Sequence, residues 1–192
     1  MCQLEMNKKM EYNYYILKQK LGNVIYSLKT HEKAIERKER YILWMKWANI
    51  ILVSSILVSI ILQLIFKNDF YSYIGIGLTV VEFSLVLIGL NFNYVNEVYE
   101  HEKTINDLWK IREQIYNLLV DIKSKSIDIN DVIKRRDEID ECLNLIYKYS
   151  LKTSNEDYKK ASEVLKNGEK PKSDDEEYRN FLPENLWEYS ND

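Results

Sequence analysis

The sequence predicts an all-α integral membrane protein, built as a two-helix transmembrane hairpin with long flanking cytoplasmic helices. Three observations support this fold class. Two long apolar blocks lie close together in the first half of the chain, and apolar residues elsewhere recur at spacings of three and four. The 192 residues also include only 5 Gly and 2 Pro, which leaves little sequence for long loops. We therefore expect short connections and long helices.

The order of these features divides the chain into four parts. We expect an N-terminal cytoplasmic helix at 1–42, a transmembrane hairpin at 43–95, a C-terminal cytoplasmic helical domain at 96–167 and an acidic, mobile tail at 168–192. The first part is helical over 4–40, because its apolar residues fall on one helical face: Leu17, Leu21, Val24, Ile25, Leu28 and Ile35.

The first apolar block, 47–66, has the length and composition of a membrane span. Its 20 residues carry no charge, and 13 of them are Ile, Leu, Val or Phe. A bilayer core about 30 Å thick needs roughly 20 apolar helical residues. The alternative is a buried helix of a soluble protein, but so short a chain could not surround a helix that is apolar on every face.

The second block, 71–95, also has 13 such residues, but Glu82 lies near its middle. Gly75, Glu82 and Gly89 are seven residues apart and share a helix face, with Thr79 beside it. Small residues let membrane helices approach closely, so we expect this face to pack against protein. Two readings of Glu82 stay open. It is either a protonated, packed side chain hydrogen-bonded to a serine of the first span (Ser54, Ser55 or Ser59), or a carboxylate lining a cation path in an oligomer.

Basic residues set the predicted orientation. The connecting loop holds only Lys67, whereas five basic residues precede the first span: Lys33, Arg37, Lys38, Arg40 and Lys46. The positive-inside rule then puts both termini in the cytoplasm. Residues 1–46 hold 10 basic and 5 acidic residues, a net charge of +5, which suits contact with an anionic leaflet of the lipid bilayer. We expect no direct binding of nucleic acid, because the basic and aromatic residues do not alternate in the pattern of any known nucleic-acid-binding module.

The C-terminal domain is predicted to hold three helices. One apolar face runs from Ile105 to Ile122 and ends near Ser124, and a second helix capped by Asp128 or Asn130 reaches about Ser150. Residues 154–157 resemble a capping box that opens a third helix ending near 167–168.

The tail differs in composition, with 8 acidic and 3 basic residues in 168–192. Two readings stay open for its apolar side chains, which either fold back on the helical domain or dock a partner protein. The docking candidates are Phe181, Leu182, Leu186 and Trp187.

The residues that support catalysis are sparse. Two Cys and two His exclude a disulfide scaffold and a His-rich metal site, and no Gly-rich phosphate loop is present. His31 and His101 lie on charged helical stretches, so we expect each to be solvated. We therefore predict no enzyme, no metal and no cofactor.

The order of a basic, aromatic helix, a two-span hairpin and cytoplasmic helices resembles the SLATT family, the SMODS- and SLOG-associating two-transmembrane effector domains of bacterial conflict systems. The most particular piece is the sequence Asn155-Glu156-Asp157-Tyr158-Lys159, and the likeness covers about 10–167. It implies an inner-membrane effector encoded beside a sensor, such as a nucleotide-second-messenger synthase or a reverse transcriptase.

The leading functional hypothesis is an effector of a bacterial antiphage defence system that oligomerises and opens a pore or disrupts the inner membrane when a sensor signals. Several copies would be needed, since two helices cannot enclose a pore. The alternative is a non-conducting, membrane-anchored protein that tethers a partner.

Overall fold

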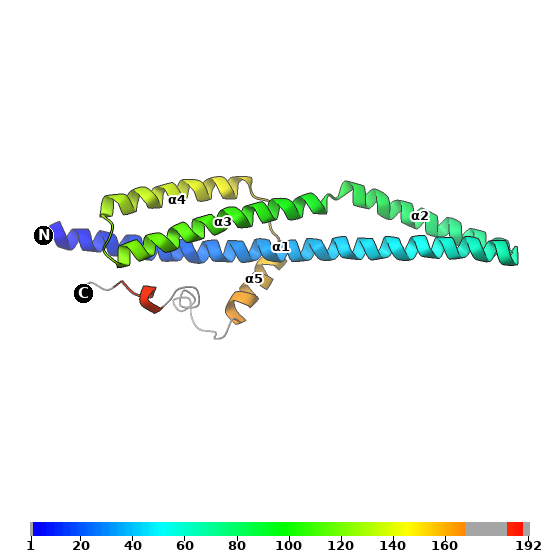
Figure 1. The fold of residues 1–192 in the computed structure, drawn as a ribbon, viewed down its shortest axis with the longest axis horizontal. Helices are drawn as coiled ribbons and strands as arrows, with labels where there is room; N and C mark the ends of the chain where they lie inside the picture. The colour runs from blue at the N-terminus through cyan, green and yellow to red at the C-terminus, as the bar shows by residue number, and fades with distance from the viewer. Residues whose placement is uncertain (1, 168–183, 190–192) are drawn as a thin grey trace. The chain divides into compact units, whose positions relative to one another are not determined.

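The fold is all-α throughout the described chain. The computed structural model describes residues 2–167 and 184–189. These residues form five α-helices and one short 3-10 helix, and they include no strand: α1 (Cys2–Phe66), α2 (Asp69–Asn91), α3 (Tyr94–Lys123), α4 (Ile129–Tyr149), α5 (Asn155–Asn167) and η2 (Glu184–Leu186) (Figure 1). The predicted fold class is confirmed in this respect, and the helix predicted over 4–40 is part of α1.

The chain divides into two compact units. One, here called the helical unit, comprises Met1–Ile35 and Glu100–Asp192, and the other, the hairpin unit, comprises Glu36–Tyr99. These units differ from the parts expected from sequence. The N-terminal helix joins the C-terminal helices in a single unit, and the hairpin unit extends beyond 43–95 at both ends. The reason for the extension is that polar residues outside the apolar blocks also pair, as Lys38 does with Glu97.

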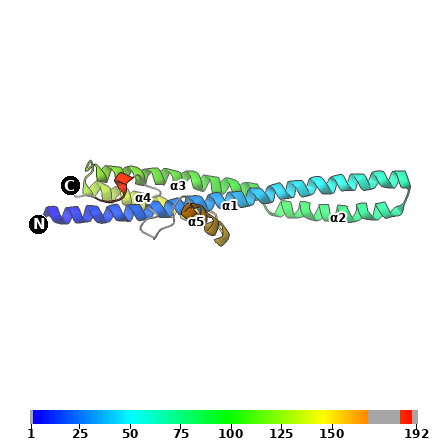
Figure 2. The ribbon, with the colours of Figure 1, turned by 90° about the horizontal axis from the view of Figure 1, so that it is seen from below.

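The hairpin unit turns sharply between its two apolar helices (Figure 2). Lys67 adopts the left-handed conformation with φ 49°, and its N–H donates to the carbonyl of Gln63 at 2.9 Å. Asn68 then caps α2 by accepting from the N–H of Phe70 at 3.0 Å. The connection outside helix is therefore only two residues long, 67–68, shorter than the four residues expected.

The second apolar block is not one helix over 71–95, because α2 ends at Asn91 and α3 begins at Tyr94. The side chain of Asn93 accepts from the N–H of Asn96 at 3.2 Å. An asparagine before a helix satisfies one of the backbone donors that have no partner inside the helix. This cap allows α3 to begin as a separate helix after α2.

The helical unit packs the first part of α1 beside α3 and α4, which run next to it in both ribbon views (Figures 1 and 2). Its core holds apolar side chains from α1, α3 and α4 at three- and four-residue spacings, as in antiparallel bundles. The larger members are Tyr14, Leu17, Leu21, Leu28, Leu108, Ile111, Ile115, Leu118, Leu119, Ile122, Ile139 and Leu143.

Capping side chains fix the N-terminal ends of α4 and α5. Asp128 accepts from the N–H of Asn130 at 3.1 Å, which confirms it as the cap of α4. At α5, the N–H of Asp157 donates to Ser154 Oγ at 3.2 Å, and the N–H of Ser154 donates to the Asp157 carboxylate at 2.9 Å. The predicted capping box is thereby confirmed, with aspartate in the place usually taken by glutamate.

Candidate functional site

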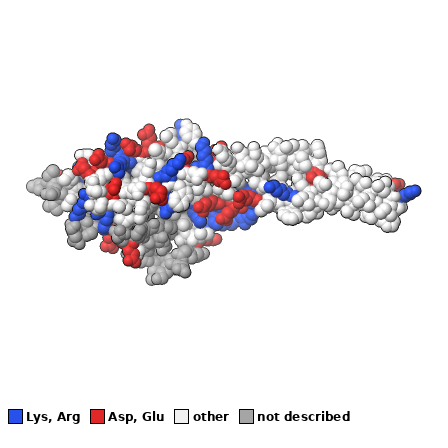
Figure 3. Space-filling model, in the orientation of Figure 1, with Lys and Arg blue, Asp and Glu red and all other residues white. Residues whose placement is uncertain are grey.

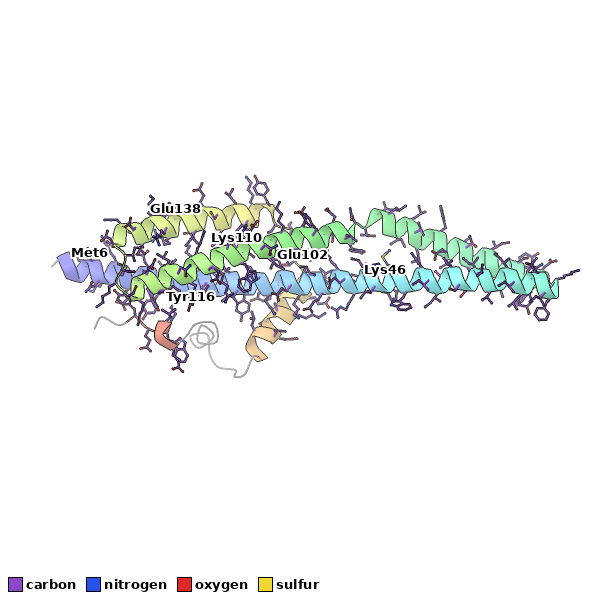
Figure 4. All side chains as sticks on the ribbon, in the orientation of Figure 1. Met6, Lys46, Glu102, Lys110, Tyr116 and Glu138 are labelled. Carbon is purple, nitrogen blue, oxygen red and sulfur yellow. The ribbon has the colours of Figure 1, made fainter. Side chains whose placement is uncertain are left out.

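The outer surface of the hairpin is apolar. Two stretches of 18 residues, one in Glu5–Phe66 and one in Asp69–Lys123, have mean hydropathies of 2.4 and 2.0, and only 6% of each is buried. By length and composition, a helix in each of these two ranges can cross a membrane. Few charged side chains show on the hairpin surface, whereas both signs are dense over the helical unit (Figure 3). Side chains project outward along both hairpin helices beyond Lys46 (Figure 4). Apolar residues so exposed in water would be costly, so a lipid environment fits them.

Less exposed positions mark the seam between the two apolar helices, and they alternate at spacings of three and four. This is the spacing of helices that pack at a shallow crossing angle. On α1 the repeating set is Ile42, Met45, Asn49, Leu52, Ile56, Ser59 and Gln63, flanked by Ala48, Ser55 and Leu62, and on α2 it is Tyr71, Gly75, Leu78, Glu82, Leu85 and Gly89, flanked by Ser72. Asn49, Ser59, Gln63 and Glu82 thus all lie on this seam.

Gly75 and Gly89 allow the two helices to approach. A Cβ at Gly75 would lie 3.0 Å from Ser59 Oγ, and one at Gly89 would lie 2.9 Å from Met45 Cε. A Cβ at Gly77, by contrast, would meet nothing within 4 Å. Gly75 and Gly89, which belong to the small-residue face predicted on α2, therefore lie against α1.

Thr79 lies beside the face of the two glycines, one helical turn after Gly75. It is exposed, and its hydroxyl donates to the carbonyl of Gly75 in its own helix at 2.8 Å. Because Thr79 is exposed in the single chain, its role in helix packing stays a prediction.

Glu82 lies on the seam, and its Oε2 atom is buried without a hydrogen-bond partner among the described residues. The three candidate serines do not supply one. Ser59 Oγ donates to the carbonyl of Tyr71, Ser55 Oγ donates to that of Ile51 at 2.8 Å, and Ser54 is exposed. The structure therefore does not show the predicted hydrogen bond between Glu82 and a serine of the first span. On the same seam, Gln63 Oε1 is likewise buried without a partner in the described chain.

The basic residues before the first span differ in environment. Arg40 and Lys46 are exposed, as contact with a lipid surface requires, and Lys33 and Arg37 are half-buried. Lys38 is only 8% exposed. Its ammonium pairs with Glu97 and lies 5.8 Å from the centre of the Tyr94 ring, so it ties α1 to α3 and does not face lipid.

In the helical unit, His31 and His101 form a buried pair that the sequence analysis missed. Their Nδ1 atoms are 2.8 Å apart, so one ring donates a hydrogen bond and the other accepts it. His31 is 5% exposed and His101 is fully buried, which makes the prediction of solvated histidines wrong. Burial, and next the neighbouring His101, lower the pKa of His31 from 6.5 to about 4, although the charge of Asp157 acts in the opposite direction. The sequence signal was the three- and four-residue spacing, which places His31 three residues after core Leu28.

A cavity of about 800 Å³ opens beside this pair, between α1, the end of α4 and α5. Its walls are mainly polar and aromatic, with residues from α1, from the α4–α5 segment and from α5: Asn23, Tyr26, Ser27, Thr30, His31, Tyr147, Ser150, Leu151, Lys152, Thr153, Tyr158 and Ser162. It was not foreseen, because its residues come from two distant parts of the sequence, 23–31 and 147–162.

The docking candidates of the tail fall in two groups. Phe181 and Leu182 lie outside the described residues. Leu186 is 1% exposed and belongs to the core, and its carbonyl accepts from the buried hydroxyl of Tyr14 at 2.5 Å. Trp187 packs against the same core, and its carbonyl accepts from Lys18 at 2.5 Å. Leu186 and Trp187 therefore fold back on the helical domain, which is the first of the two predicted alternatives.

The described residues show no catalytic constellation. Residues 2–167 and 184–189 include no cluster of three or more His, Cys, Asp or Glu side chains arranged to hold a metal ion. The fold and the hairpin thus define a class, namely all-α proteins with two helices able to span a membrane and a separate helical unit.

Within this class, the chain belongs to the SMODS and SLOG-associating 2TM effector domain family 4, SLATT_4, whose model matches residues 14–177. The match covers most of the 192 residues and confirms the resemblance seen in the sequence. Comparisons with curated proteins and with solved structures gave no match.

Proposed function

We propose that this chain is a membrane effector of a bacterial antiphage system, which oligomerises and forms a pore or disrupts the inner membrane when a partner sensor activates it. The observation that carries the proposal is the Glu82 carboxylate oxygen, buried without a hydrogen-bond partner in an otherwise apolar hairpin. Membership of a 2TM effector family agrees with this function.

The cost of unpaired acceptors favours assembly. A buried polar group without a hydrogen bond destabilises a protein by roughly 1–3 kcal/mol, and ionisable groups inside a membrane face protein or water. Glu82 Oε2 and Gln63 Oε1 both lack a donor in the described chain. Donors from further copies, or from water in a shared channel, would satisfy them if assembly separates α2 from α1 at this seam. Because two helices cannot enclose a channel, we infer a homo-oligomer.

The proposed orientation has both termini in the cytoplasm. The exposed cations Arg40 and Lys46 precede the first apolar block, and only Lys67 lies at the turn. This asymmetry follows the positive-inside rule. The helical unit then lies on the cytoplasmic side, where a sensor could reach it.

The proposed partner is a sensor encoded nearby. The family name associates these domains with SMODS and SLOG proteins, so we expect a protein of one of these kinds, such as a nucleotide-second-messenger synthase. A reverse transcriptase is the other sensor that we consider.

The test is membrane potential in bacteria that express the full chain, alone and with its neighbouring gene product, beside Glu82→Gln. We expect the native chain to depolarise the membrane and Glu82→Gln to do so less, because the variant removes the charge and keeps the shape. Glu82→Asp should restore activity in part, and Ser84→Ala, at an exposed position of α2, is the matched control.

The outcomes separate the hypotheses. Equal depolarisation by the native chain and Glu82→Gln would keep the pore and return Glu82 to a packing role. No depolarisation by an inserted chain, even with a confirmed trigger, would reject the pore and favour the non-conducting tether.

A further inference from the structure

The cavity of the helical unit has the size and composition of a small-molecule site. Sites for small molecules span roughly 300–1,000 Å³, and this cavity is about 800 Å³. It is independent of the hairpin, because all of its lining residues belong to the helical unit. Binding at this cavity would therefore not depend on whether the hairpin conducts ions.

Aromatic rings form one wall. The rings of Tyr26 on α1 and Tyr158 on α5 stack with centroids 6.2 Å apart and planes at 30°. Tyr158 is 56% exposed and Tyr147 is 43% exposed, so both present ring surface to solvent at the cavity. Exposed tyrosine rings at a cavity offer planar surfaces on which a flat heterocycle can stack.

The charge of the lining is one-sided. Lys152 is exposed, and none of the twelve lining residues is Asp or Glu, although the chain as a whole has a net charge of −3. The cavity therefore favours an anion over a cation. A lysine ammonium is a flexible point charge that commonly binds phosphate.

Hydroxyl and amide groups complete the lining. Ser27 Oγ and Tyr147 Oη are 3.2 Å apart and form a hydrogen bond across the cavity wall between α1 and α4. Asn23, Thr30 and Ser162 add further polar atoms. These groups can donate to and accept from the hydroxyls of a sugar or the edge of a base.

We propose that this cavity binds a phosphorylated nucleoside. The base stacks on Tyr158 beside Tyr26, the phosphate pairs with Lys152, and Asn23, Ser27 and Tyr147 bind the remaining polar edge. A simple apolar ligand would leave these polar groups unpaired, and a free phosphate would make no use of the rings. The combination of rings and a lone cation specifies a compound that carries both a planar heterocycle and an anion.

The test is isothermal titration calorimetry on the full chain in detergent micelles, with the four common ribonucleoside mono- and triphosphates, the corresponding nucleosides and inorganic phosphate. We expect saturable binding of at least one nucleotide. Its nucleoside and inorganic phosphate should each bind about tenfold more weakly, or not at all.

Two variants and two matched controls locate the binding. Tyr158→Ala should weaken nucleotide binding by about tenfold through lost stacking, whereas Tyr149→Ala removes a 74% exposed tyrosine outside the cavity and should not. Lys152→Ala should weaken binding of the nucleotide but not of the nucleoside, whereas Lys148→Ala should weaken neither. All four residues are exposed, so the fold should survive, which circular dichroism checks.

Three results would overturn the proposal. These are no saturable binding of any nucleotide at millimolar concentration, binding that is unaffected by both Tyr158→Ala and Lys152→Ala, and binding of inorganic phosphate as tight as that of the nucleotides. The second result would place the nucleotide elsewhere on the chain.

Discussion

At the scale of single residues, the polar groups in packed positions distinguish this chain from a plain helical bundle. His31 and His101 occupy core positions of the helical unit, and Glu82 occupies a seam position of the hairpin. A buried polar group is stable only when it finds a partner. The histidines supply each other with one, and we attribute the unpaired Glu82 oxygen to a partner outside the single chain.

The histidine pair should make stability depend on pH. The pKa of His31 falls from 6.5 to about 4 on folding, so between these values the unfolded chain binds the extra proton. The contribution of the neutral, buried His31 to the free energy of unfolding is fully present above pH 6.5 and is lost as the pH falls toward 4. It amounts to about 3 kcal/mol at most. The melting temperature of the full chain in detergent should therefore decrease between pH 7 and pH 5.

A variant that cannot titrate tests this prediction. His31→Gln keeps a hydrogen-bonding side chain beside His101, and its melting temperature should fall less over the same pH range. An equal decrease in both proteins would assign the pH dependence to other groups.

Tyr14 should hold the C-terminal segment to the core. Its buried hydroxyl donates to the carbonyl of Leu186, and burial raises the pKa of Tyr14 to about 12, so the hydroxyl keeps its proton near neutral pH. Losing such a bond costs about 1 kcal/mol. In Tyr14→Phe, amide hydrogen exchange around 184–189 should therefore be about fivefold faster. Tyr12→Phe, at a 68% exposed position, should leave this exchange unchanged and would contradict the prediction if it did not.

At the scale of elements, the spacing of small and apolar residues decides which helix faces meet. Gly75 lies against Ser59, and Gly89 lies against Met45, so α2 packs on α1 along one antiparallel seam. The alternation of three and four residues gives each helix a narrow stripe and leaves its other faces apolar and exposed. Such a helix pair has a defined seam for its partner and a wide surface for lipid.

Two glycines of α2 provide a matched test of that seam. Gly75→Val places a branched side chain against Ser59 and should separate α2 from α1, which lowers the melting temperature of the detergent-solubilised chain by several degrees. Gly77→Val adds the same atoms where nothing lies within 4 Å and should be neutral or slightly stabilising. Equal effects of the two substitutions would argue against this packing.

At the scale of the whole molecule, the proposed topology puts the turn at Asn68 and the exposed Cys142 on opposite sides of the membrane. The check uses a Cys2→Ser background, with and without Asn68→Cys, in spheroplasts treated with a membrane-impermeant maleimide. We expect labelling only of the protein with Asn68→Cys, because the proposed topology places Cys142 in the cytoplasm. Labelling of Cys142 in sealed spheroplasts would reverse the orientation. Detergent lysis, which should expose Cys142, controls for its reactivity.

The sequence by itself determined the helical class, the two apolar blocks, the capping box that begins at Ser154, and the family, and it narrowed the cap of α4 to Asp128 or Asn130. These properties depend on local composition and on periods of a few residues, which are read along one chain. Only the tertiary structure decided that His31 meets His101, that Leu186 enters the core, that Thr79 is exposed and that a polar cavity forms beside α5. The physical reason is that such contacts join residues far apart in sequence, such as the 70 positions between the histidines, and their register is fixed only when whole helices pack.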